Sequence, residues 1–119
     1  MKISCIKGNL MQGISNVSKA VSTKTTHPIL SCIFIEAENG NIKLTANDME
    51  IGIESYVEGT VIEEGKVAIE AKLLSDIVRK LPDNDVVIET DENLQATITC
   101  EKANFNISCK PGDEFSYLP

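Results

Sequence analysis

The sequence predicts an α+β fold in which one order of elements occurs twice. Segments with alternating apolar residues, typical of strands, surround two segments with the period of an amphipathic helix. The order strand, helix and three strands spans residues 1–58 and recurs over 66–109, although the residues themselves do not repeat. We therefore expect two units related by a pseudo-twofold axis, with both helices packed side by side on antiparallel sheets.

The first unit begins with a strand over Met1–Lys7, which Gly8 ends. A helix is expected from Asn9, because Gln12 three residues later completes a variant of the capping box. Its apolar residues recur on one helical face: Leu10, Ile14, Val17 and Val21. A polar loop over Ser22–Pro28 follows. The expected strands of this unit are Ile29–Ala37, Ile42–Ala46 and Ile51–Val57, with Asn39-Gly40 as a hairpin turn.

The second unit repeats this plan. Lys66–Glu70 is expected to be a strand and Ala71–Leu81 a helix, which Pro82 ends. The apolar face of this helix consists of Leu73, Leu74, Ile77, Val78 and Leu81. Its polar stripe consists of Lys72, Asp76, Arg79 and Lys80, with Asp76 and Lys80 in favourable i,i+4 order. The expected strands are Val86–Thr90, Leu94–Cys100 and Asn104–Cys109.

The composition fits one domain over residues 1–119 with an aliphatic core, since 42% of residues are hydrophobic and tryptophan is absent. No apolar run reaches membrane-spanning length and no signal peptide is recognisable, so we expect a cytoplasmic protein that does not enter a membrane. The four cysteines have no metal-ligand spacing. Core thiols are expected, with a disulfide or a metal site as the alternative.

The charges are sorted along the chain. The net charge is -7, yet residues 1–35 contain four lysines and no acid, and Ala71–Leu81 carries three cations against one acid. The acids are concentrated in the expected strand regions, 36–70 and 82–119. The cations therefore belong to the helices, and the two helices together should present a positive face.

A positive helical face indicates a surface that follows the phosphate backbone of nucleic acid without reading bases. The alternative is an ordinary solvated helix face, with the acidic sheets as a protein-interaction surface for a basic partner. A third possibility is a hydrolase built around Asp48, Glu50 and His27, which would have to converge in space. Solvated carboxylates and a surface histidine are the simpler interpretation, and no cofactor or metal is expected.

The last strand, Asn104–Cys109, alternates apolar and polar residues and ends its unit, so we expect it at a sheet edge. An unprotected edge can pair with another chain. The alternative is an edge protected by the flanking Lys102 and Lys110.

Five segments resemble the first domain of the bacterial sliding clamp family, the β subunit of DNA polymerase III. They are Lys24–Leu30, Leu44–Ile53, Val67–Pro82, Phe105–Ser108 and Phe115–Pro119. The resemblance covers the whole chain and implies the DNA-clamp fold. It also implies a non-catalytic processivity factor: two subunits of three domains close into a ring around duplex DNA. The second and third domains, with the sites for polymerase and clamp loader, are expected to be absent from this chain.

The resemblance also implies roles for single residues. DNA contacts are expected from Lys24, Lys72, Arg79 and Lys80, and the polar side of the first helix adds Lys19. The subunit interface is expected to use Phe105 and Ile107 on the edge strand, with Leu73 and Ile77 packed behind them. Asn104 stands where some members carry arginine and Leu73 where many carry lysine, so the apolar part of that interface is retained and its ionic part is not carried over.

Overall fold

The computed structural model describes residues 1–21, 28–48 and 50–112. Its helices are α1 (Lys7–Ser18), the 3-10 helix η1 (Pro28–Ser31) and α2 (Ala71–Lys80). The first five strands are β1 (Lys2–Ile6), β2 (Cys32–Glu38), β3 (Asn41–Asn47), β4 (Gly52–Val57) and β5 (Thr60–Glu63). The next five are β6 (Gly65–Glu70), β7 (Asp85–Thr90), β8 (Gln95–Cys100), β9 (Ala103–Ser108) and β10 (Lys110–Pro111).

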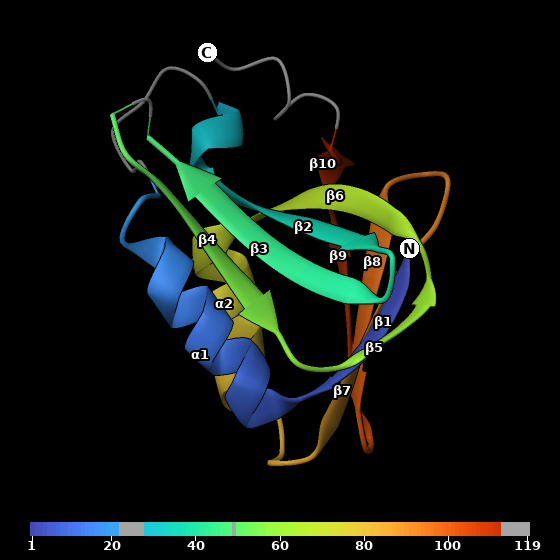
Figure 1. Cartoon of the computed structure of the whole chain (residues 1–119). Helices are drawn as coiled ribbons and strands as arrows, with labels where there is room; N and C mark the ends of the chain where they lie inside the picture. Colours follow the sequence, from blue (N-terminus) through green and yellow to red (C-terminus); the bar gives the residue numbers. More distant parts are fainter. Residues whose placement is uncertain (22–27, 49, 113–119) are drawn as a thin grey trace.

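The strands form two five-stranded sheets, and each sheet contains two strands from the other half of the chain. Sheet A has the order β5-β1-β7-β8-β9, and sheet B has the order β10-β6-β2-β3-β4. All pairings are antiparallel. Strand β1 of the first unit therefore joins β7 of the second, and β6 of the second unit joins β2 of the first (Figure 1). The two units are interlocked by this exchange.

The expected α+β fold and pseudo-twofold order are confirmed, with one addition. Each unit has a fifth strand at its end: β5 pairs with β1, and β10 pairs with β6. The sequence interpretation missed both. Each lies at a sheet edge and is short, four residues in β5 and two in β10, so neither carries enough alternation to be recognised.

The helices follow their strands directly. Helix α1 begins at Lys7 and not at Asn9, so the expected capping box is wrong: neither N-cap residue, Ile6 or Glu70, makes a side-chain cap hydrogen bond. The backbone amide of Lys7 instead donates to the carbonyl oxygen of Asn84 at 3.0 Å. A long-range contact thus replaces the local cap, and the strand fixes where each helix starts.

Two other boundaries differ from expectation. Helix α1 ends at Ser18, before Val21, whose amide donates to the carbonyl of Ser18 in a turn. Residues 28–31 form η1, so the strand expected from Ile29 begins at Cys32. The expected hairpin turn is confirmed, since Asn39 and Gly40 both have positive φ angles, 53° and 79°.

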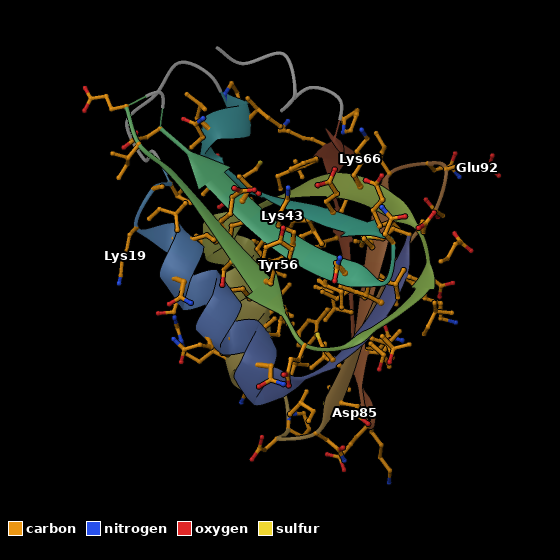
Figure 2. The ribbon with its side chains drawn as sticks, viewed as in Figure 1. Lys19, Lys43, Tyr56, Lys66, Asp85 and Glu92 are labelled. Atoms are coloured by element: carbon orange, nitrogen blue, oxygen red, sulfur yellow. The ribbon has the colours of Figure 1, made fainter. Side chains whose placement is uncertain are left out.

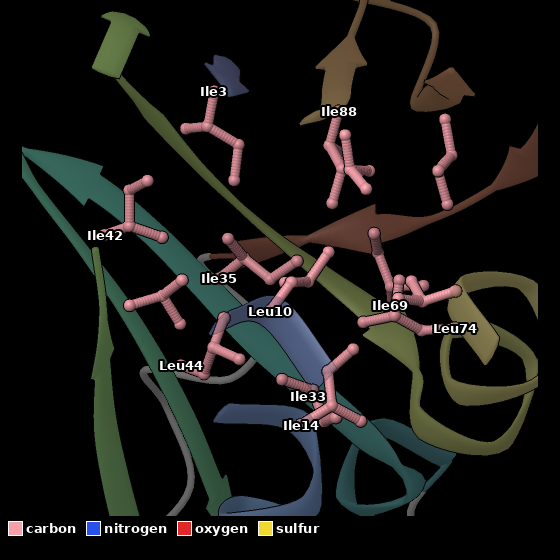
Figure 3. Close-up of a cluster of buried hydrophobic side chains, with 14 of the residues drawn as sticks. Ile3, Leu10, Ile14, Ile33, Ile35, Ile42, Leu44, Ile69, Leu74 and Ile88 are labelled. Atoms are coloured by element: carbon pink, nitrogen blue, oxygen red, sulfur yellow. The ribbon is translucent and has the colours of Figure 1, made fainter. Parts of the chain in front are cut away.

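The aliphatic core lies between the helices and the inner faces of both sheets (Figure 3). Its largest fully buried side chains include Ile3, Leu10, Ile14, Ile35, Leu44, Leu74 and Ile98. Within the described ranges, no polar or charged side chain is buried. Cys5, Cys32 and Cys100 are buried free thiols and Cys109 is half-buried, which confirms the interpretation as core thiols. Burial, with Asp85 nearby, raises the pKa of Cys5 to about 11.

Gly59 lies where the chain crosses from sheet B to sheet A. A Cβ atom there would lie 2.5 Å from the backbone oxygen of Ser4 and 2.8 Å from Cys5 Cβ, so the backbone of β1 leaves no room for a side chain. At Gly8, in the first turn of α1, a Cβ atom would meet nothing within 4 Å. The two glycines are therefore a matched pair for substitution, because an added methyl group clashes at Gly59 and meets no atom at Gly8.

We predict that Gly59→Ala lowers the free energy of unfolding by roughly 1–3 kcal/mol, because the methyl group forces β1 and β5 apart. Gly8→Ala should leave it unchanged or raise it by up to about 1 kcal/mol, through better helix propensity. Urea denaturation followed by circular dichroism measures both. Equal stability of the two variants would contradict the close approach at Gly59.

Candidate nucleic-acid interface

The two helices pack against each other and run in opposite directions (Figure 1). Lys7, the first residue of α1, reaches the C-terminal end of α2. Its ammonium nitrogen Nζ donates to the carbonyl oxygens of Arg79 at 3.1 Å and Leu81 at 2.7 Å. Carbonyls at the C-terminal end of a helix have no intrahelical hydrogen-bond donor, and a cation is favourable at this end of the helix dipole. Lys7 therefore fixes the two helices to each other.

Helix α2 presents its cations to solvent. Ala71, Leu74, Ile77 and Val78 are buried, whereas Lys72, Arg79 and Lys80 are exposed. The buried residues recur at helical spacing, so they turn the basic side chains away from the core. This arrangement confirms the amphipathic pattern expected for the second helix, except that Leu73 of the expected apolar face is exposed.

One of these cations is paired. Arg79 Nη1 lies 3.3 Å from Asp76 Oδ1, and Arg79 Nη2 donates to Ser75 Oγ at 3.0 Å. The expected pairing of Asp76 with Lys80 is thus replaced by an i,i+3 pair with Arg79. Among the described residues, Lys72 and Lys80 form no ion pair. An exposed pair of this kind is weak, so Arg79 can still turn toward another anion.

Helix α1 contributes less positive charge to the surface of the helix pair than we expected from the acid-free stretch that contains it. Its solvent side carries neutral groups: Gln12 Nε2 donates to Asn16 Oδ1, and Asn16 Nδ2 donates to Ser55 Oγ. Lys7 is the one charged residue within the helix, and it binds α2. Lys19, immediately after α1, is exposed (Figure 2). Lys24 lies outside the described residues.

The antiparallel packing groups the cations at the two ends of the helix pair. Lys19 follows the last residue of α1, at the end of the pair where Lys72 lies in the first turn of α2. Arg79 and Lys80 lie at the other end, beside Lys7. Neutral polar side chains lie between these ends on α1. The arrangement is a diffuse positive surface without aromatic side chains, which suits contacts to phosphates and not to bases.

Two lysines on the sheets are in a different situation. On β3, Lys43 Nζ lies 3.2 Å from Glu36 Oε1 and 3.0 Å from Glu54 Oε2. Both carboxylates raise the pKa of the Lys43 ammonium, and Glu54 has the larger effect. Lys2 on β1 lies 4.0 Å from Glu89 Oε2. Carboxylates thus neutralise these sheet cations, whereas Lys19, Lys72 and Lys80 on the helix side have no such partner within the described part of the chain.

Strand β9 is an edge strand of sheet A, as the sequence predicted. Phe105 and Ile107 point toward the core side of the sheet but remain partly exposed. Leu73 on α2 is 38% exposed, whereas Ile77 is 6% exposed. Ile77 can therefore support an interface only from behind, while Phe105, Ile107 and Leu73 have surface left to bury.

The residues of the hydrolase alternative do not form a catalytic group in the described structure. Asp48 Oδ1 accepts hydrogen bonds from the amides of Glu50 at 2.9 Å and Ile51 at 2.8 Å, which lower the pKa of Asp48. The carboxylate therefore stabilises the turn before β4, and His27 lies outside the described residues. Over the ranges that the structure covers, no three histidine, cysteine or acidic side chains gather closely enough to hold a metal ion. In the same ranges no helix is long and apolar enough to cross a bilayer.

The sequence interpretation missed the role of Lys7. A signal was present, because a lysine in the first turn of a helix is unfavourable to its dipole and therefore needs a partner elsewhere. The identity of that partner depends on how the helices pack, which the sequence pattern does not fix.

Comparison with known proteins gives one consistent result. The family model for the N-terminal domain of the DNA polymerase III beta subunit matches residues 1–119. The beta sliding clamp of Synechocystis sp. is 39% identical, over all of this chain and 32% of its own length. The chain thus spans about a third of the curated relatives that it matches.

Solved structures agree in fold. The crystal structure of a protein from Eubacterium rectale, described as a putative DNA polymerase III beta subunit, has a TM-score of 0.96 and 58% identity over all of this chain and 32% of its own. The DNA polymerase sliding clamp of Bacillus subtilis has a TM-score of 0.94 and 35% identity over all of this chain and 33% of its own.

We predict that Lys7→Met lowers the free energy of unfolding by about 1 kcal/mol, since the carbonyls of Arg79 and Leu81 lose a charged donor. Hydrogen exchange of the amides in the last turn of α2 should accelerate with it. Lys19→Met removes the same charge from the other end of the helix pair and should change stability by less than about 0.5 kcal/mol. Identical effects of both variants would contradict the capping role of Lys7.

Proposed function

Because the chain belongs to the family of the DNA polymerase III beta subunit, through its N-terminal domain, we propose that it acts as the first domain of a sliding clamp. In this role it is a non-catalytic processivity factor in bacterial DNA replication. A ring of such subunits encircles duplex DNA and keeps the polymerase on its template. The observation that carries this proposal is the match over the whole chain together with the exposed cations of the helix pair.

The charge arrangement supports a helical lining of the ring. Sliding requires contacts that are weak, diffuse and independent of sequence. Long lysine and arginine side chains at both ends of the helix pair can provide such contacts: Lys19, Lys72, Arg79 and Lys80. The resemblance to the family adds Lys24 to this proposed set. The net charge of -7 repels DNA from the rest of the surface and so confines it to this side.

The edge strand supports closure of the ring. Among the described strands β9 pairs with β8 alone, and the partly exposed Phe105 and Ile107 can bury their remaining surface against a second subunit. Leu73 adjoins this apolar surface from α2 in the proposed interface, and Ile77 supports it from the core. We propose a homodimer for the complete protein, in which the β9 edge meets the partner subunit.

The polymerase and the clamp loader are proposed partners of the complete protein, through regions of its relatives outside the third that this chain matches. The cytoplasm is the proposed location, because replication takes place there in bacteria. No cofactor is needed for this function, which depends on topology and not on chemistry.

We predict that alanine at Lys24, Lys72, Arg79 and Lys80 of the complete ring-forming protein shortens its retention on circular DNA. Each phosphate contact contributes about 0.9 to the slope of log K against log salt, so this slope should become shallower by roughly 3 to 4. Retention on nicked plasmid at several salt concentrations measures both. The control is Lys2→Ala, which removes a cation from the outer face of sheet A. An unchanged slope in the fourfold variant would show that these residues do not face DNA.

We also predict that Phe105→Ala combined with Ile107→Ala weakens the dimer of the complete protein by about a hundredfold or more, because apolar anchors dominate such interfaces. Sedimentation over a dilution series measures the dissociation constant. The control, Ile62→Ala, removes a 54% exposed side chain from β5 at the opposite edge of sheet A and should leave the dimer intact. A dimer that survives the double substitution would place the interface elsewhere.

A further inference from the structure

The outer face of sheet B carries a row of side chains that the proposed clamp function does not use. The strand registers place Lys66 opposite Glu36, Glu36 opposite Lys43, and Lys43 opposite Tyr56. Figure 2 shows Lys66, Lys43 and Tyr56 along the front of this sheet. Helix α1 packs on the other side of sheet B, so this row is separate from the helix pair.

The face has a surplus of negative charge. Around Tyr56 its glutamates are Glu36, Glu38, Glu54 and Glu64, and its lysines are Lys43 and Lys66. The strand registers add one more residue of each sign toward the β10 edge of the sheet, Glu70 and Lys110, so the surplus remains. Lys43 is already shared by Glu36 and Glu54. Glu64 lies at the same end of the sheet, where its carboxylate accepts the backbone amide of Asn39 at 2.7 Å. A cation from another molecule would therefore meet uncompensated carboxylates here.

Tyr56 is the large exposed side chain of this face. It is 69% exposed, and no described residue shares a hydrogen bond with its hydroxyl group. Two shallow hollows of about 200 and 250 Å³ lie on the face, and Glu36 and Glu38 line both. Tyr56 and Asn41 complete the first hollow. These hollows are smaller than the roughly 300–1,000 Å³ of a small-molecule site, but one protein side chain fits such a space.

We propose that this surface, the Tyr56 face (Glu36, Glu38, Asn41, Lys43, Glu54 and Tyr56), binds a basic segment of a partner protein through arginine. A guanidinium group can stack on the tyrosine ring and donate two parallel hydrogen bonds to one carboxylate. A lysine of the partner would bring only a point charge, without a planar group that can stack on the ring. Lys43 already places such a charge between Glu36 and Glu54. The carboxylates repel phosphates, which makes nucleic acid an unsuitable ligand.

The proposal does not depend on the clamp function, because the Tyr56 face lies on the opposite side of sheet B from α1. A partner bound there would leave the helix pair and the β9 edge accessible. An exposed tyrosine beside acidic side chains has the composition of an interaction surface for arginine, a residue that is enriched at protein interfaces.

The test uses the 119-residue chain labelled with ¹⁵N and a seven-residue capped peptide that alternates glycine with arginine. Its lysine counterpart is the second probe. We expect the arginine peptide to shift the amide resonances of the Tyr56 face and to bind at least about three times more tightly than the lysine peptide. Tyr56→Ser should weaken the arginine peptide by about tenfold, and Glu38→Gln by about threefold.

The matched control is Glu92→Gln, which removes the same charge from the turn between β7 and β8 of sheet A (Figure 2). It should leave the affinity unchanged, and the spectra of all variants verify their fold. The proposal would be overturned if Glu38→Gln and Glu92→Gln lost the same affinity for the arginine peptide. It would also be overturned if both peptides bound equally well, or if neither bound at millimolar concentration. Shifts of the same amides with protein concentration alone would also overturn it, because a second copy of the chain would then occupy the face.

Discussion

The exchange of first strands between the two halves of the chain determines the rest of this structure. Strand β1 completes the sheet of the second unit, and β6 completes the sheet of the first. Each exchanged strand leads into its helix without an intervening residue, at Ile6–Lys7 and Glu70–Ala71. The positions of the helices are therefore set by the sheets and not by local caps. Neither unit can bury its apolar face alone, so the domain should fold as one cooperative unit.

The same exchange explains why the charge sorting has a spatial meaning. It brings the start of α1 to the end of α2, where Lys7 occupies the free carbonyls. The other cations near the helix ends then remain in solvent, whereas Lys2 and Lys43 on the sheets lie beside carboxylates. A lysine next to two glutamates contributes little to the attraction of an external anion. Lys19, Lys72 and Lys80 are exposed and have no carboxylate partner among the described residues, so they attract an external anion more than the net charge of the chain suggests.

The sequence predicted the elements that carry a long regular pattern. Helix α2 begins and ends within one residue of expectation, because its apolar period is complete and Pro82 stops it. The strands β3, β4, β7 and β8 were predicted for the same reason. The edge strand β5 was missed, since three of its four side chains are exposed and one is half-buried, which leaves no alternation to recognise. The bonds of Lys7 and the pairing of Arg79 with Asp76 depend on tertiary distances or on competing rotamers, which no spacing rule determines.

The outer faces of the two sheets differ in a way that the proposed ring would require. On sheet A, the strands next to the free edge carry neutral pairs, with Thr97 Oγ1 2.9 Å from Asn106 Oδ1 and Gln95 Nε2 3.2 Å from Ser108 Oγ. Two acidic subunits that meet at this edge would repel each other if carboxylates lined it, because like charges on neighbouring strands are destabilising. Hydroxyl and amide groups avoid that repulsion, and they form hydrogen bonds with one another before the subunits associate. The acids lie instead on the turns, on strands β5 and β7 away from this edge, and on sheet B, where the Tyr56 face offers a surface to a partner of opposite charge.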